Sequence, residues 1–226
     1  EVAPLGAEIQ SLRTPAGEDL LWNGDPAVWS GRAPVLFPIV GRAPDDRIAV
    51  GAFEAEMKQH GFARRMHFTL IEQTATGCSW RLRDSAETRA AYPFAFALTL
   101  TYRLEGPALT VTAEVQNLGA DSMPFGLGFH PAFRWPLPGA KGKPHRIALA
   151  NGAEPQMARL NHSLLPQDRH PSPFEQGRLT LAPEQFEEDA MIFPTGAGNA
   201  LRYGPDQGPH LAFRFDNLPN LALWTK

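Results

Sequence analysis

Residues 94–115 read FAFALTLTYRLEGPALTVTAEV, and this stretch decides the fold class. In residues 94–104 every second side chain is large and apolar, with Ala, Thr or Arg between them. Successive side chains of a β-strand point to opposite faces, so the pattern predicts a strand with one buried face. The same alternation resumes in residues 109–115, after the Gly-Pro turn within residues 105–108. The stretch therefore predicts an antiparallel β-hairpin.

Weaker alternation elsewhere in the chain predicts further short strands. These lie at residues 66–70, 78–82, 147–149 and 211–215. Short strands at regular spacing are typical of a sandwich or barrel. Helical patterns are missing apart from at most one turn at Pro183–Phe186. Two intervals rich in Pro, Gly, Asp and Asn, residues 17–62 and 152–177, predict extended loops, where binding sites are often built.

Length and composition indicate one folded, all-β domain over residues 1–226. The chain is 43% hydrophobic and 20% charged, which is typical of globular proteins. The net charge of −3 and the scattered Lys and Arg residues argue against a nucleic-acid partner. No apolar run approaches the length of a membrane span, and Cys78 is the sole cysteine. These features predict a cytoplasmic location with no membrane association.

Two short segments place a histidine among glycine and aromatic residues. They are QHGFAR at residues 59–64 and GLGFHPAF at residues 126–133. Glycine allows close backbone approach and Pro131 fixes the chain after His130, so both imidazoles are candidates for rigid presentation. Histidine titrates near neutral pH and can exchange protons there. From these residues alone, a structural role for each histidine in its loop remains the more common alternative.

Other kinds of site have little support in the sequence. His60 and His130 are far apart, and there is no HExxH or CxxC spacing, so we expect no metal. The GLG segment lacks the third glycine of a dinucleotide cradle, and no GxSxG elbow is present. The acidic run Glu187-Glu188-Asp189 is typical of a solvated face. The five Trp residues either pack in the core or stack on a sugar ring.

Read together, several segments resemble the aldose 1-epimerase (mutarotase) family, in order along nearly the entire chain. They are GAEI (6–9), LWNGDP (21–26), Trp29, APVLFPIVGR (33–42), HGFAR (60–64), YPF (92–94), Asn117 and GFHPAF (128–133). The APVLFPIVGR and HGFAR segments look closer to the bacterial galactose mutarotase-related branch than to the hexose-6-phosphate epimerases. The resemblance implies a large antiparallel β-sandwich of the galactose mutarotase type, in agreement with the alternating strands.

The resemblance also implies an activity, the interconversion of the α and β anomers of a free aldohexose without a cofactor. It places the general acid at His130 and a second histidine near the ring oxygen at His60. It assigns substrate binding to Arg42, at the end of the GR loop, to Asp189, and to Arg64 as a further cation of the pocket. The expected partner is a monosaccharide. We expect His130 to protonate the ring oxygen while a base removes the anomeric proton.

The family's general base is a glutamate that follows a Leu-Trp-Thr-like strand, and this sequence ends at Leu223-Trp224-Thr225-Lys226. We therefore expect the base beyond residue 226 and the sandwich to lack its C-terminal segment. An isomerase activity is predicted on that condition. Two alternatives stay open: a non-catalytic carbohydrate-binding or sugar-sensing protein on the same fold, and a hexose-6-phosphate epimerase.

Overall fold

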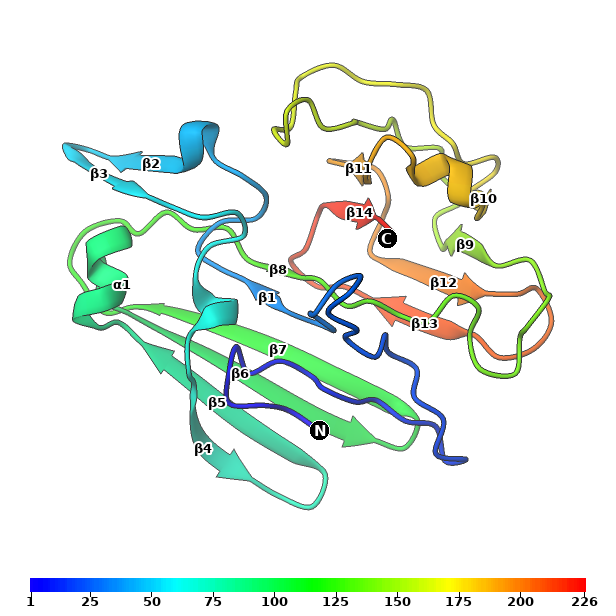
Figure 1. The fold of residues 1–226 in the computed structure, drawn as a ribbon, viewed down its shortest axis with the longest axis horizontal. Coiled ribbons are helices and arrows are strands. Elements are labelled where there is room, and N and C mark those ends of the chain that lie inside the picture. The colour runs from blue at the N-terminus through cyan, green and yellow to red at the C-terminus, as the bar shows by residue number, and fades with distance from the viewer. The chain divides into compact units, whose positions relative to one another are not determined.

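A computed structural model describes residues 1–226, which fold almost entirely into antiparallel strands joined by loops (Figure 1). Contacts between Cα atoms divide the chain into two compact units. Unit 1 contains Glu1–Ser11 and Gly31–Pro131, and unit 2 contains Leu12–Ser30 and Ala132–Lys226. Each unit is thus built from two separate stretches of chain. A single domain over residues 1–226 stays a prediction.

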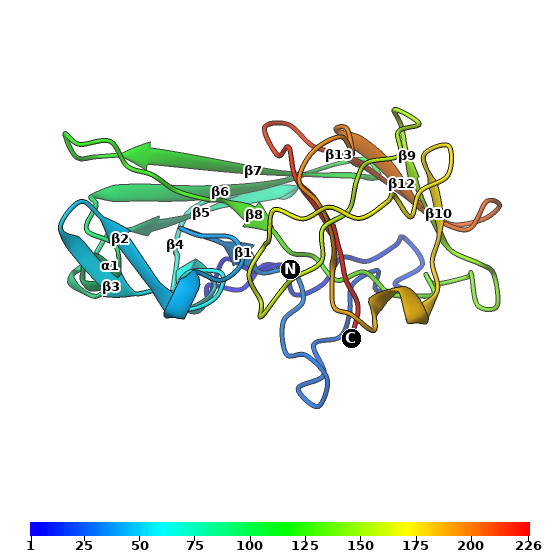
Figure 2. The same ribbon diagram turned by 90° about the horizontal axis from the view of Figure 1, so that it is seen from above.

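The largest sheet of unit 1 has four antiparallel strands in the order β4-β5-β6-β7. Their bounds are β4 Thr69–Gln73, β5 Gly77–Arg83, β6 Phe96–Glu105 and β7 Ala108–Asn117. Strands β5, β6 and β7 run side by side in both views of the ribbon (Figures 1 and 2). The predicted hairpin is confirmed, because β6 and β7 pair without interruption from Phe96↔Asn117 to Glu105↔Ala108.

The apolar face of this sheet forms the core of unit 1. Leu98 and Leu100 on β6 are fully buried, whereas the equivalent positions on β7 are half-buried. Burying one such side chain stabilises a fold by roughly 1.5–3 kcal/mol. The hydroxyl of Tyr102 donates to the carbonyl oxygen of Ala7 at 2.6 Å, so this buried polar group is also satisfied. The alternation read from the sequence therefore corresponds to real burial.

The remaining elements of unit 1 are short. They are β1 Val35–Leu36, β2 Arg47–Val50, β3 Phe53–Glu56, β8 Gly128–Phe129, the 3-10 helices η1 Pro44–Asp46 and η2 Ala63–Arg65, and helix α1 Ala86–Ala91. The β2–β3 hairpin lies in an interval predicted as loop, because its faces alternate only between half-buried and exposed. Helix α1 was not predicted either. Its local signal is Ser85, whose side chain accepts from the amide of Thr88.

Unit 2 contains a four-stranded sheet in the order β10-β9-β12-β13 and the strand pair β11-β14. The bounds are β9 Arg146–Leu149, β10 Arg178–Thr180, β11 Met191–Phe193, β12 Ala200–Gly204, β13 Leu211–Arg214 and β14 Leu221–Leu223. The helical turn predicted at Pro183–Phe186 is confirmed as the 3-10 helix η3. The core of unit 2 includes the buried side chains of Leu149, Phe174 and Phe193. No helix of the chain combines the length and apolar character of a membrane span.

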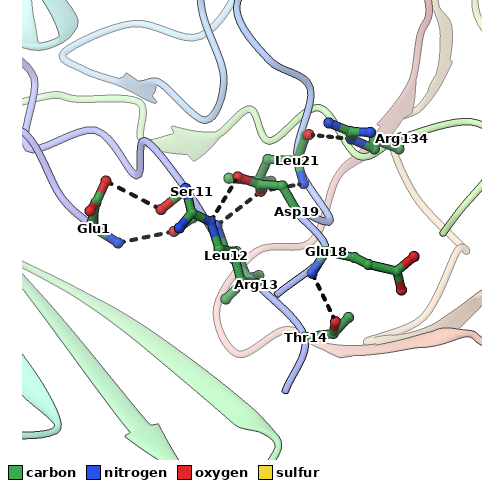
Figure 3. A network of polar contacts seen from close by, with 9 residues as sticks. All are labelled: Glu1, Ser11, Leu12, Arg13, Thr14, Glu18, Asp19, Leu21 and Arg134. Atoms are coloured by element: carbon green, nitrogen blue, oxygen red, sulfur yellow. Dashed lines mark hydrogen bonds and ion pairs between the residues drawn. The ribbon is translucent and has the colours of Figure 1, made fainter. Parts of the chain in front are cut away.

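A polar network ties the first segment of unit 2 together (Figure 3). The carboxylate of Asp19 accepts from the amides of Leu12 and Leu21, each at 3.2 Å, and forms an ion pair with Arg13. The Arg134 guanidinium donates to the carbonyl oxygen of Leu21 at 3.2 Å. These bonds attach residues 12–21 to the segment after Ala132, although the two are far apart in the sequence.

Candidate active site

The APVLFPIVGR segment is the frame on which both histidine segments are fixed. On one side, β1 pairs with β8 through Val35↔Phe129, and β8 is followed directly by His130. The amide of His130 continues the ladder by donating to the carbonyl oxygen of Pro34 at 3.0 Å. Further along the same segment, the carbonyl oxygen of Pro38 accepts from the amide of Gly126 at 2.7 Å. The GLGFHPAF segment is therefore bonded to the frame at Gly126 and at His130.

The HGFAR segment is bonded to the same frame by other groups. The carbonyl oxygen of Phe37 accepts from the amides of Phe62 and Ala63, at 3.0 and 3.1 Å. The amide of His60 donates to the carbonyl oxygen of Gly41 at 2.7 Å. Two loops that are about 70 residues apart in the sequence are thus bonded to the same backbone segment. Functional residues are often carried by loops that a rigid scaffold positions in this way.

The structure brings the two imidazoles together. Their ring centroids are 5.4 Å apart with an angle of 75° between the ring planes, an edge-to-face arrangement. Both residues are half-buried, and the Nδ1 atom of His130 is fully buried. The convergence of His60 and His130 is thus a geometric fact of this fold, while their action on a sugar stays a prediction.

His60 is held in one protonation form by Gly41. The Gly41 amide donates to Nδ1 of His60 at 3.0 Å, so Nδ1 carries no hydrogen and Nε2 must carry it. His60 also has a positive φ of 66°, a conformation that costs free energy in a residue other than glycine. The reciprocal bonds with Gly41 fix this strained backbone and present an Nε2–H donor.

Gly61 makes the close approach to the frame possible. Its φ is +69°, and a Cβ atom at this position would lie 2.1 Å from the carbonyl oxygen of Phe37. Such a distance is far below van der Waals contact, so a side chain there would push the loop off the frame. The glycine next to His60 is therefore a requirement of the site's backbone.

Both histidines favour the neutral form. Burial, and then the positive charges of His130, Arg64 and Arg65 in that order of importance, together lower the pKa of His60 to about 4. Burial also lowers the pKa of His130, with a smaller contribution from the charge of Arg64. Since a positive charge on His130 disfavours one on His60, the pair resists binding two protons at once.

Arg64 follows His60 by four residues in the HGFAR segment, and its charge lowers the pKa of both histidines. Its side chain is half-buried and donates to the carbonyl oxygen of Gln59 at 3.1 Å. Burial lowers the pKa of Arg64, and the neighbouring charge of Arg65 adds to the effect. Of the three predicted substrate-binding residues, Arg64 is the one whose charge affects the pKa of both histidines.

Arg42 forms its side-chain interactions with a residue of its own loop, Asp46. Its Nε and Nη2 atoms donate to the two carboxylate oxygens of Asp46 at 2.7 and 2.6 Å, a bidentate ion pair. The hydrogen bond to Asp46 raises the pKa of Arg42, and the carboxylate charge adds to this. Sequence reasoning missed Asp46, although its position four residues after Arg42 was a possible signal. It also missed the role of Gly41, for which the sequence offers no signal beyond a glycine.

Asp189 belongs to unit 2. Its backbone has a positive φ of 68°, and its carboxylate accepts from the amide of Ala190 at 2.7 Å. Its carbonyl oxygen accepts from Arg159, also at 2.7 Å. The carboxylate is exposed and keeps free lone pairs for a ligand. No group of three or more His, Cys, Asp or Glu side chains has the geometry to hold a metal ion.

Comparisons with known proteins give the family. The aldose 1-epimerase family profile matches residues 1–198. Protein LacX (chromosomal) of Lactococcus lactis subsp. lactis is 30% identical over 237 residues, covering 98% of this chain and 78% of LacX. A galactose mutarotase-related enzyme of Lactobacillus acidophilus has a TM-score of 0.90 at 29% identity, over 99% of this chain and 76% of that structure. A galactose mutarotase-like protein of Lactobacillus casei has a TM-score of 0.90 at 28% identity, over 99% and 78%.

These matches confirm two predictions made from the sequence. The fold class, an all-β antiparallel sandwich of the galactose mutarotase type, agrees with both the sheets and the solved structures. The family match extends over both histidine segments and the frame between them. The chain belongs to the aldose 1-epimerase family.

Proposed function

We propose that this protein is an isomerase that interconverts the α and β anomers of a free aldohexose by general acid–base ring opening. The observation that carries the proposal is the His60–His130 pair, with ring centroids 5.4 Å apart and both loops bonded to one backbone segment. Membership of the aldose 1-epimerase family supports this reaction over other uses of a histidine pair.

In the proposed reaction His130 acts as the general acid. A base removes the proton of the hydroxyl on C1, the C1 to ring-oxygen bond breaks, and His130 donates its proton to the ring oxygen as the aldehyde forms. Ring closure on the opposite face of the aldehyde gives the other anomer and returns both protons. A positioned proton transfer of this kind contributes about 100-fold to 10,000-fold in rate.

The electrostatics of the pair support different roles for the two histidines. A proton on His130 keeps His60 neutral, because the charge of His130 lowers the pKa of His60. The neutral His60 then offers its Nε2–H as a hydrogen-bond donor to a sugar oxygen, since Nδ1 is occupied by the Gly41 amide. His60 is thus suited to orient the sugar and His130 to transfer the proton.

The remaining residues are proposed as follows. Arg64 donates to a sugar hydroxyl. Arg42 binds the sugar together with Asp46, whose carboxylate already aligns the guanidinium. Asp189 accepts from vicinal hydroxyls through its exposed carboxylate. The base is the glutamate that the resemblance places after Thr225, beyond the residues described.

Anomer exchange measured by NMR on the full-length protein tests the proposal. Wild type is expected to exchange α- and β-galactose or glucose faster than buffer, and His130→Ala to lose most of that rate. A non-catalytic sugar-binding protein would instead bind the sugar saturably and leave the rate at the buffer value. A phosphosugar epimerase would turn over the 6-phosphate faster than the free sugar. Either outcome would contradict the proposal.

A further inference from the structure

Unit 1 has a hollow whose lining contains neither His60 nor His130. Its volume is about 680 Å³, within the range of small-molecule sites. The hollow forms because β4 begins at Thr69, which pairs with Arg81, while β5 continues to Arg83. Residues 65–67, which precede β4, and the end of β5 line the two sides of this gap. We refer to it as the β4–β5 cleft.

The cleft is positively charged although the whole chain carries a formal net charge of −3. Three arginines line it, Arg65, Arg81 and Arg83, against one carboxylate, Glu87. The concentration of guanidinium groups in one hollow favours an anionic ligand, because concave charged surfaces focus the field on their contents.

Two of these arginines are directed by the strand itself. Arg81 and Arg83 are two residues apart on β5, so they share the face opposite the buried side chains of Trp80 and Leu82. Their Cα atoms are about 7 Å apart, which lets two guanidinium groups bind one anion from different sides. Arg81 donates through Nε to Thr99 at 3.1 Å, which leaves its Nη groups available. Arg83 forms no hydrogen bond or ion pair through its side chain.

The third arginine is fixed at the other side of the cleft. Nη1 of Arg65 donates to the carbonyl oxygen of Gly61 at 2.6 Å, and its remaining donors are available at an exposed position. The hydroxyl of Thr69 adds a neutral donor, and apolar walls include Met66 and Ile71. The cleft thus combines an anion-binding side with space and apolar surface for an attached organic group.

We propose that the β4–β5 cleft binds the phosphate group of a small molecule or inorganic phosphate through Arg65, Arg81 and Arg83. Three guanidinium groups match the double negative charge of a phosphate monoester better than the single charge of a carboxylate, and arginine binds phosphate oxygens in a bidentate manner. The cleft is distinct from the histidine pair. The proposal therefore does not depend on the proposed epimerase function.

Isothermal titration with inorganic phosphate and with glycerol 3-phosphate, which is not an aldose, tests the cleft. We expect saturable binding of at least one of them. The double variant Arg81→Gln/Arg83→Gln is expected to weaken it by about tenfold or more, because it removes two of the three guanidinium groups that bind the anion. Binding of both ligands would point to phosphate as the recognised group, and binding of glycerol 3-phosphate alone to a phosphorylated small molecule.

Arg103→Gln is the matched control, because Arg103 is an exposed arginine on β6 outside the cleft. The side chain of Arg103 points to the same face of the sheet as that of Thr99, which pairs with Arg81 across the strands. Its variant should bind phosphate as wild type does. The proposal is overturned if neither ligand binds saturably, or if Arg103→Gln weakens binding as much as the double variant. Arg81, Arg83 and Arg103 are all at least partly exposed, and circular dichroism verifies that the variants remain folded.

Discussion

At the scale of single residues, the site depends on which nitrogen of His60 carries its hydrogen. A side-chain type alone does not specify this, because a neutral imidazole has two tautomers. Here the Gly41 amide selects the Nε2–H form, and burial with neighbouring charges keeps the ring neutral. The resemblance to the family implied that His60 and His130 act on one sugar, but the hydrogen bond from Gly41 comes from a backbone atom that no side-chain pattern reveals.

The lowered pKa of His60 predicts a pH dependence of stability. The unfolded chain binds a proton at His60 near pH 6.5, whereas the folded chain does so only near pH 4. The contribution of neutral His60 is therefore present above pH 6.5 and is lost as the pH falls from 6.5 to 4. Urea unfolding of wild type and His60→Gln across this window should show a smaller loss in the variant.

A matched histidine gives the control for that experiment. His67 is an exposed histidine of the same unit. His67→Gln should retain the pH dependence of wild type between pH 6.5 and 4. If His60→Gln and His67→Gln lose stability in parallel with wild type, the burial and charge effects assigned to His60 are wrong.

At the scale of elements, long regular strands were predictable and short irregular ones were not. The β6–β7 hairpin has ten residues in each strand and one predominantly apolar face, so alternation alone identified it. Strands β1 and β8 have two residues each, too few for any period to be visible. These short strands nevertheless position His130. The site therefore rests on elements whose pairing depends on distant residues. The residue patterns marked both histidine segments as candidates, and only the resemblance to a family joined them into one site.

A substitution at Gly61 tests how the loop that carries His60 depends on its contact with the frame. Gly61→Ala should destabilise the protein by about 1–3 kcal/mol, because the new methyl group meets the Phe37 carbonyl in a left-handed backbone conformation. Gly51→Ala is the control. Gly51 has a similar φ of +58°, but a Cβ atom there would meet no atom within 4 Å.

Chemical denaturation of the two glycine variants separates backbone strain from the close approach. Gly51→Ala should lose only the strain component, about 1 kcal/mol. A smaller loss in Gly61→Ala than in Gly51→Ala would show that the HGFAR loop does not depend on contact with the frame.

At the scale of the whole molecule, the division into two units was not predictable from the sequence. Each unit combines an N-terminal stretch with a later one, and β9 pairs with β12 about 50 residues further on. Local periodicity shows that a segment is a strand but not which sheet it joins. Because neither unit is a continuous stretch of chain, we propose that both fold together as one cooperative domain.

Calorimetry of two core variants tests this cooperativity. Leu98→Ala in unit 1 and Phe193→Ala in unit 2 each remove a fully buried side chain, which costs about 2–5 kcal/mol. We expect one unfolding transition in each variant, shifted to a lower temperature as a whole. Two transitions, of which only one moves in each variant, would show that the units unfold independently.

Anomer exchange by His130 variants tests the central claim most directly, that two neighbouring imidazoles on one backbone frame catalyse sugar ring opening. We predict that full-length wild type accelerates the interconversion of α- and β-galactose or glucose, and that His130→Ala lowers the rate at least about 100-fold, as loss of a general acid requires. The His67→Gln control should exchange at the wild-type rate. Equal exchange by His130→Ala and wild type would contradict the account.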